Sequence, residues 1–136
     1  MGLGCRGNYS MVRQAFNRCT GCQYACKIIN ARKFADQPIV LRAFEREPNI
    51  VSFIDFYSND ETYWIIMEYV SGGDLNKYFD MKPVPEESEV KHLTRQICEA
   101  VRYMHERGFV HRDIKPDNIL LASRDRGLVK LSDLGS

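Results

Sequence analysis

HRDIKPDN, residues 111–118, is the most informative stretch of this 136-residue chain, and SDLG follows it at 132–135. The short apolar runs between the two motifs predict a loop that leads into a small hairpin. Carboxylate and amide oxygens suit Mg²⁺, a lysine can neutralise a phosphate, and another carboxylate can take a proton from a hydroxyl group. Phosphoryl transfer requires these groups. The polar side chains of the stretch are Asp113, Lys115, Asp117, Asn118 and Asp133.

One long helix is predicted upstream of this stretch. From about Glu86 to Arg107, apolar residues recur at a spacing of three and four, and Gly108 follows the last turn. A shorter helical piece at about 74–79 comes after SGGD, which we interpret as a flexible break. The apolar residues of the long helix are Val90, Leu93, Ile97, Val101 and Met104.

The N-terminal half is rich in strand formers. Residues 8–30 alternate on either side of the turn-prone Thr20-Gly21, and residues 49–70 form two further strand-like runs. Two β-hairpins are therefore expected. Between them, prolines confine any helix to about Ile39 to Glu47. The order of elements predicts an α+β fold.

Charge and composition exclude several classes of protein. The chain has 19 Lys and Arg against 18 Asp and Glu, so its net charge of +1 lacks the basic surface of a nucleic-acid-binding protein. The longest apolar run, Tyr63–Met67, is too short to span a membrane. Five cysteines, an odd number, favour a reducing compartment. We expect an intracellular protein of the cytoplasm or nucleus that binds neither nucleic acid nor membrane.

A C-x-x-C pattern occurs at Cys19 and Cys22. A structural zinc site needs four ligands, and no second cysteine or histidine pair stands at finger-like spacing. We therefore interpret these cysteines as residues of a hairpin turn.

HRDIKPDN with its downstream DLG resembles the catalytic loop and metal-binding motif of the eukaryotic protein kinase family. The resemblance implies a two-lobed fold that binds ATP and Mg²⁺. By this resemblance, Asp113 would be the catalytic base and Lys115 would contact the γ-phosphate. Asn118 and Asp133 would hold the magnesium ions. A lysine at position 115 is the pattern of Ser/Thr kinases.

The N-terminal half resembles the same family. In YACKII, Ala25 would cover adenine and Lys27 would reach the α- and β-phosphates as a further catalytic residue. MEYVSGGD, residues 67–74, resembles the family's hinge segment. The other nucleotide-binding positions that the resemblance implies are Met67, Glu68, Val70, Asp74 and Leu120.

The glycine-rich loop can be read in two registers. Gly2, Gly4 and Gly7 fit G-x-G-x-x-G literally, but that register puts Tyr9 where a valine should cover adenine. We choose the register that makes Val12, 15 residues before Lys27, the adenine-covering residue, as in the calcium/calmodulin-dependent kinase group. The expected phosphate-binding and adenine-covering positions are then Gly4, Gly7, Ser10 and Val12.

Two features depart from the family pattern. The interval after Lys27 is short, and the glutamate that should pair with this lysine is Glu45 or Glu47, unless both are solvated charges. The sequence also stops one residue after DLG. We therefore expect a partial kinase domain without its first strand: residues 1–67 as N-lobe, 68–73 as hinge and 74–136 as an incomplete C-lobe.

The resulting hypothesis is a Ser/Thr protein kinase that phosphorylates protein hydroxyl groups with Mg-ATP. The alternative is a catalytically inactive, truncated kinase-like module that binds nucleotide or a partner protein. The apolar stripe of the long helix and the strand at 8–17 are expected to be exposed, where a chaperone or regulatory partner would cover them.

Overall fold

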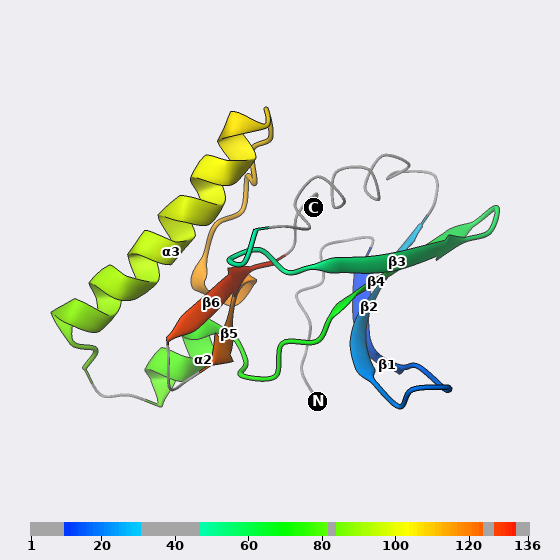
Figure 1. Cartoon of the computed structure of the whole chain (residues 1–136), viewed down its shortest axis with the longest axis horizontal. Coiled ribbons are helices and arrows are strands. Elements are labelled where there is room, and N and C mark those ends of the chain that lie inside the picture. Colours follow the sequence, from blue (N-terminus) through cyan, green and yellow to red (C-terminus); the bar gives the residue numbers. More distant parts are fainter. Residues whose placement is uncertain (1–9, 31–46, 82–83, 124–126, 133–136) are drawn as a thin grey trace. The chain divides into compact units, whose positions relative to one another are not determined.

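The computed structural model contains two compact units, each with its own sheet (Figure 1). The first unit comprises residues 1–45 and 52–69, and the second comprises 46–51 and 70–136. The structure describes residues 10–30, 47–81, 84–123 and 127–132.

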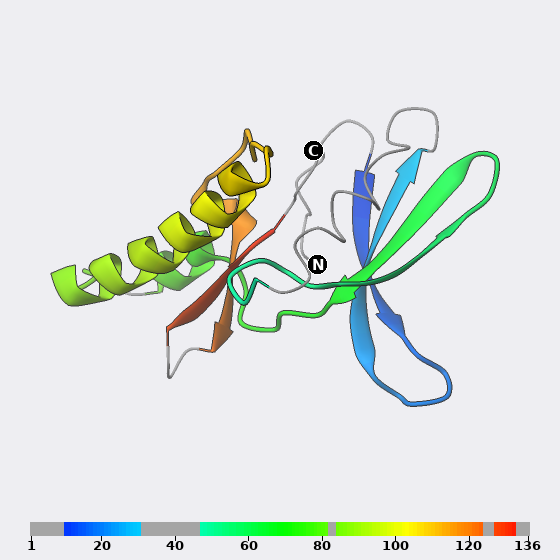
Figure 2. The same ribbon diagram turned by 45° about the horizontal axis from the view of Figure 1, so that its top comes forward.

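The first unit is built on a four-stranded antiparallel sheet with the strand order β1-β2-β4-β3 (Figure 2). Both predicted hairpins are present, because β1 pairs with β2 and β3 pairs with β4. The alternating, β-branched and aromatic residues of these segments suit a pleated sheet. The strands are β1 (Ser10–Phe16), β2 (Gln23–Asn30), β3 (Phe53–Ser58) and β4 (Thr62–Glu68).

Asparagine side chains shape the turns of both hairpins. In the turn between β3 and β4, Asn59 Oδ1 accepts hydrogen bonds from the backbone N–H groups of Glu61 and Thr62, both at 2.8 Å. In the turn between β1 and β2, Asn17 does the same for Cys19 and Thr20. Asparagine favours turns because its side chain bonds to nearby backbone groups in this way.

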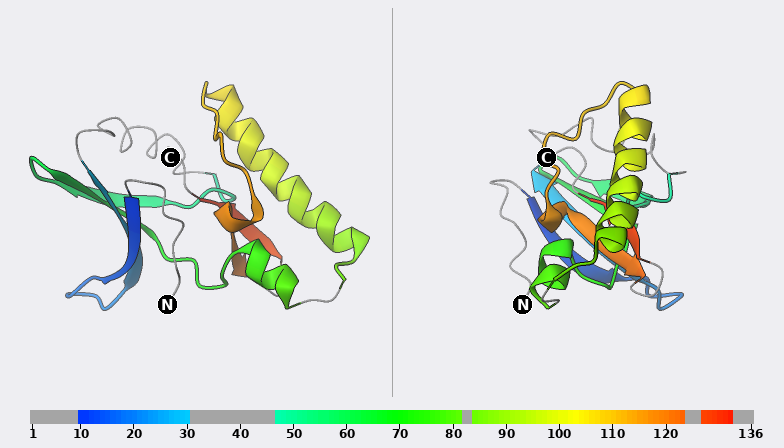
Figure 3. Two further views of the ribbon diagram at one scale, coloured as in Figure 1. Left: turned by 180° about the vertical axis from the view of Figure 1, so that it is seen from behind. Right: turned by 90° about the vertical axis from the view of Figure 1, so that its left-hand side faces the viewer.

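The second unit contains two helices and a β-hairpin, and α3 runs alongside that hairpin (Figure 3). Asp74 caps α2, because its carboxylate accepts a hydrogen bond from the Lys77 N–H at 2.9 Å. α3 ends at Glu106, and Gly108 follows its C-cap residue Arg107 with a φ of +81°, which favours glycine. Both helices lie within one residue of their predicted bounds. The elements are α2 (Leu75–Asp80), α3 (Glu87–Glu106), η1 (Pro116–Asn118), β5 (Ile119–Ser123) and β6 (Leu128–Leu131).

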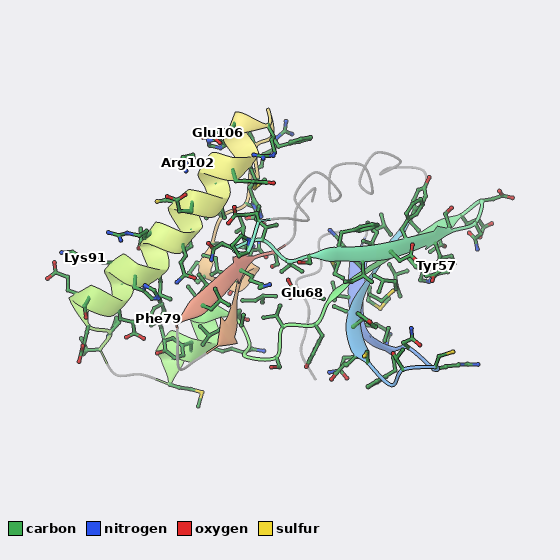
Figure 4. All side chains as sticks on the ribbon, viewed as in Figure 1. Tyr57, Glu68, Phe79, Lys91, Arg102 and Glu106 are labelled. Carbon is green, nitrogen blue, oxygen red and sulfur yellow. The ribbon has the colours of Figure 1, made fainter. Side chains whose placement is uncertain are left out.

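The predicted apolar stripe of α3 is only partly buried. Leu93 and Met104 are buried as part of the core, together with Ala100, which the pattern did not single out. Val90 is 42% exposed, so the prediction of exposure holds for this end of the stripe. Lys91 and Arg102 project from the polar side of α3 and form ion pairs along the helix (Figure 4).

Gln96 joins α3 to two other segments of the second unit. Its Oε1 accepts hydrogen bonds from the side-chain amide of Asn49 and from the Val129 N–H, both at 3.0 Å. Its Nε2 donates to the carbonyl oxygens of Gly127, at 2.6 Å, and His92. One carboxamide therefore fixes α3, β6 and the segment at 47–51 against one another.

The two glycines of SGGD have fixed structural roles, so our interpretation of this segment as a flexible break was wrong. A Cβ atom at Gly72 would lie 2.0 Å from the carbonyl oxygen of Leu121. Gly73 has a φ of +78°, and its carbonyl oxygen accepts a hydrogen bond from the Leu121 N–H at 2.8 Å. The segment packs directly against the backbone of β5.

None of the described helices is long and apolar enough to cross a membrane. The predicted helix at about 39–47 lies outside the described residues, apart from Glu47.

Replacing Gly72 with alanine should destabilise the fold by roughly 1–3 kcal/mol, because the added methyl group meets backbone and cannot be accommodated by a side-chain rotation. The measurement is the free energy of unfolding in urea, with the exposed Ser71→Ala as the neighbouring control. Equal stability of the two variants would contradict the close approach of residue 72 to β5.

Candidate functional site

His111 lies at the start of the HRDIKPDN loop and is only 3% exposed. Its Nδ1 accepts a hydrogen bond from the Asp113 N–H at 3.1 Å, and its Nε2 lies 2.7 Å from the Ser132 carbonyl oxygen. A nitrogen that accepts from an N–H carries no proton, so the ring proton is on Nε2 and is donated to Ser132. The imidazole thus joins the loop to the end of β6.

Asn118 holds Asp113 from the other side of the loop. Its Nδ2 donates to the Asp113 backbone oxygen at 2.8 Å and to the Asp113 Oδ2 at 3.1 Å. Asn118 is 4% exposed, so the donor side of these bonds is buried, whereas Asp113 is partly exposed. Because the amide nitrogen has two hydrogens and both point to Asp113, Oδ1 is the atom of this side chain that can serve as a metal ligand.

Lys115 completes the polar cluster. Its Nζ lies 3.5 Å from the Asp113 Oδ2, and the side chains of Lys115 and Asp113 are 41% and 43% exposed. The ammonium and carboxylate groups are therefore close together and open to solvent. This arrangement brings an acceptor for a proton next to a cation that can meet a phosphate.

The backbone of this loop is strained at one residue. Arg112 has a φ of +72°, the only positive φ of a non-glycine residue in the part of the chain that the structure describes. Such a conformation costs free energy and persists where neighbouring interactions fix it. Here the hydrogen bonds of His111 and Asn118 to Asp113 fix the chain directly after Arg112.

Ser132 ties the end of β6 back to the loop. Its N–H and its hydroxyl both donate to the Asn118 carbonyl oxygen, at 2.8 and 3.1 Å. Asp133 follows Ser132 in the sequence but lies outside the described residues. The signal that points to Ser132 as a structural residue is its position directly before DLG, which our sequence analysis did not use.

Four of the predicted nucleotide-binding residues, Val12, Ala25, Lys27 and Met67, lie on one face of the sheet in the first unit. Val12 pairs with Lys27, and Ala25 pairs with Met67. Directly paired residues of antiparallel strands point to the same face, and positions two apart on a strand do so too. Lys27 is 4% exposed. Ser10, at the start of β1, pairs with Ile29.

The other predicted positions have structural contacts of their own. Asp74 caps α2 and forms a backbone bridge with Leu120. The Glu68 carboxylate accepts a hydrogen bond from the Ser52 N–H at 2.8 Å, and the Glu47 carboxylate accepts one from the Asn49 N–H at 3.2 Å. Val70 is half-buried. Sequence reasoning did not foresee these side-chain bonds.

Gly4, Gly7 and Glu45 lie outside the described residues, so the glycine-loop register and the partner of Lys27 stay predictions. Within the described ranges, no group of three or more histidine, cysteine, aspartate or glutamate side chains is placed to hold a metal ion.

Comparison with known proteins assigns the family. The family model described as "Protein kinase domain" matches residues 2–136. The chain belongs to the protein kinase family. The crystal structure of Rad53 1-466 in complex with AMP-PNP superposes with a TM-score of 0.84 at 39% sequence identity, covering 93% of this chain and 35% of that one. The predicted α+β, kinase-like fold is confirmed.

Curated relatives of this chain include Ser/Thr protein kinases. Serine/threonine-protein kinase RAD53 of Saccharomyces cerevisiae is 39% identical over 136 residues, which are 96% of this chain and 17% of that protein. Calcium/calmodulin-dependent protein kinase type II of Caenorhabditis elegans is 35% identical over 140 residues, covering 96% of this chain and 19% of that protein. The predicted resemblance to calcium/calmodulin-dependent kinases is confirmed. The chain spans only about a fifth of the length of these relatives.

Replacing Asn118 with alanine should lower the free energy of unfolding by roughly 1–3 kcal/mol in the absence of any ligand, because the part-buried Asp113 carbonyl loses its donor and a buried side chain is truncated. Asn118→Asp should cost more at neutral than at acidic pH, since its carboxylate would face that of Asp113 until one of them is protonated. Urea unfolding at the two pH values measures both effects.

The matched control for this prediction is Asn76→Ala. Asn76 also donates to an aspartate, at 2.8 Å from Asp117 Oδ1, but both side chains are at the surface. Its loss should change stability by no more than about 0.5 kcal/mol. Equal effects of the two alanine variants would mean that the Asn118 bonds do not stabilise the loop.

Proposed function

We propose that this chain is part of a Ser/Thr protein kinase that transfers the γ-phosphate of Mg-ATP to serine and threonine hydroxyl groups of proteins. The observation that carries the proposal is the cluster in which Asn118 and Lys115 both contact the Asp113 carboxylate. The match to the protein kinase family and the Ser/Thr kinase relatives support it.

Asp113 has the position of a general base in this proposal. Its carboxylate is partly exposed, so a substrate hydroxyl could reach it, while Asn118 restricts its rotation. A base acts efficiently when it is held within hydrogen-bonding reach of the proton that it accepts. The His111 bond to the Asp113 N–H orients the backbone of the same residue.

Lys115 supplies the positive charge next to the base. Its ammonium group, 3.5 Å from the Asp113 carboxylate, would also contact the γ-phosphate and offset its charge during transfer. A lysine at this place in the HRDIKPDN loop is the basis for assigning Ser/Thr rather than tyrosine specificity.

The residues present fit a magnesium site. The Asn118 amide presents Oδ1 as its metal-binding atom, and Asp133 is the second oxygen ligand that the motif provides. When bound, Mg²⁺ neutralises charge on the phosphate oxygens. Ser132 restrains the chain directly before Asp133 through its two hydrogen bonds to the Asn118 carbonyl oxygen.

Lys27 would bind the α- and β-phosphates, with Val12, Ala25 and Met67 against the adenine ring. Their common face on the sheet supports this assignment. The Rad53 structure that this chain resembles is a complex with AMP-PNP. Kinase turnover of about 1–100 per second corresponds to a barrier of roughly 15–17 kcal/mol. Positioning and charge neutralisation supply most of the catalysis that lowers the barrier to this height.

Replacing Asp113 with asparagine should separate binding from chemistry. The variant loses the proton acceptor, so transfer of labelled γ-phosphate to a serine-containing peptide should fall by about 10²–10⁴-fold. The rise in melting temperature that Mg-ATP produces should stay close to that of the unchanged protein. Asp133→Ala should reduce this rise, whereas Asp117→Asn should leave it intact, because Asp117 bonds to Asn76 and is none of the proposed ATP or metal ligands.

Three results of this experiment are distinguishable. A thermal shift with transfer that Asp113→Asn abolishes supports the kinase. A thermal shift without transfer favours the alternative, a nucleotide-binding module that is catalytically inactive. No shift at millimolar Mg-ATP would contradict the kinase and the nucleotide-binding module, and would leave only a module that binds a partner protein.

A further inference from the structure

We propose that Cys19 and Cys22 form a reversible disulfide, which makes the turn between β1 and β2 a thiol-modification site for small-molecule disulfides such as oxidised glutathione. This inference concerns a site in the first unit that is independent of the proposed kinase chemistry. The two cysteines are the C-x-x-C pair that no part of the phosphoryl-transfer site uses.

Both thiols are accessible. Cys19 and Cys22 are exposed, whereas Cys26, the next cysteine along the chain, is 8% exposed on β2. Burial also raises the pKa of the Cys26 thiol, which disfavours its reactive thiolate form. A reagent in solution therefore meets two thiols at this turn, and the third is protected.

The turn holds the two cysteines in one ordered loop. The Cys19 N–H donates to Asn17 Oδ1 at 2.8 Å, and the Cys22 carbonyl oxygen accepts from the Asn17 N–H at 2.9 Å. The Cys22 N–H donates to Thr20 Oγ1 at 3.2 Å. Gly21, with a φ of +73°, reverses the chain between the cysteines. Asn17 thus anchors both residues of the pair.

Other uses of the pair are less well supported. A metal site needs more ligands than two thiolates, and within residues 10–30, 47–81, 84–123 and 127–132 no group of three or more such side chains assembles. A bond between Cys22 and Cys26 would have to span four residues of extended chain, roughly 13 Å. Disulfides require Cα atoms within about 7 Å.

The chemistry consists of two thiol–disulfide exchanges. One thiolate, that of Cys19 or Cys22, attacks a sulfur of oxidised glutathione, forms a mixed disulfide and releases one glutathione thiolate. The second thiolate then attacks the protein sulfur of the mixed disulfide and releases the second glutathione. The protein loses two electrons and two protons, and oxidised glutathione becomes two molecules of glutathione. The second step is intramolecular, so it is faster than attack on the mixed disulfide by thiols in dilute solution.

In the test, the folded Cys5→Ser variant is treated with oxidised glutathione and then denatured, and its remaining thiols are alkylated. Trypsin cleaves after Arg18 and Lys27, so one peptide, CTGCQYACK, carries Cys19, Cys22 and Cys26. Mass spectrometry should find this peptide short of two hydrogen atoms and alkylated once, at Cys26. The untreated peptide should be alkylated three times. Cys5 is removed because it lies outside the described residues.

Two controls come from the same chain. Cys98 is exposed on α3 in the second unit and should retain glutathione as a stable adduct. In a Cys22→Ser variant, Cys19 loses its resolving partner and should also retain glutathione. If the unchanged turn instead carries glutathione on both Cys19 and Cys22, or bonds either of them to Cys26, the proposal is wrong. It is equally wrong if CTGCQYACK stays fully reduced while Cys98 is modified.

Discussion

The buried imidazole of His111 is the interaction on which the HRDIKPDN loop depends. A side chain that is 3% exposed must have both ring nitrogens bonded, and the two partners available are the Asp113 N–H and the Ser132 carbonyl oxygen. The ring thereby joins His111 to Ser132, which lies 21 positions further along the chain. The positive φ of Arg112 follows from the same constraint, because the chain must turn sharply between His111 and Asp113.

Asn118 extends this constraint into a connected network. Its side chain donates twice to Asp113, and its carbonyl oxygen receives both donors of Ser132. Gln96 then fastens β6 to α3. The loop that carries Asp113 and Lys115 is therefore positioned by hydrogen bonds within the second unit. Such an arrangement allows a phosphoryl-transfer site to be ordered before its substrates arrive, which lowers the entropy cost of reaction.

Local patterns in the sequence predict the strands, the hairpin turns and α3, because alternation and three-four spacing reflect which face of each element is buried. The proximity of Asp113 and Asn118 follows from their shared motif. The roles of Gln96 and Gly72 could not be predicted, since their partners, Val129 and Leu121, lie far away in the sequence. Neither could Ala100, whose small side chain gives a weak apolar signal although it is fully buried on α3.

The hydrogen bonds of His111 and Asn118 should preorganise the loop in the protein without nucleotide. Nitrogen-15 NMR of the ligand-free chain can test this through the tautomer of His111. We expect a single tautomer with the proton on Nε2, slow exchange of that proton with water, and an Nδ1 that accepts from the Asp113 N–H. Averaging between the two tautomers, or rapid exchange of the Nε2 proton, would contradict it and mean that the loop becomes ordered only when substrates bind.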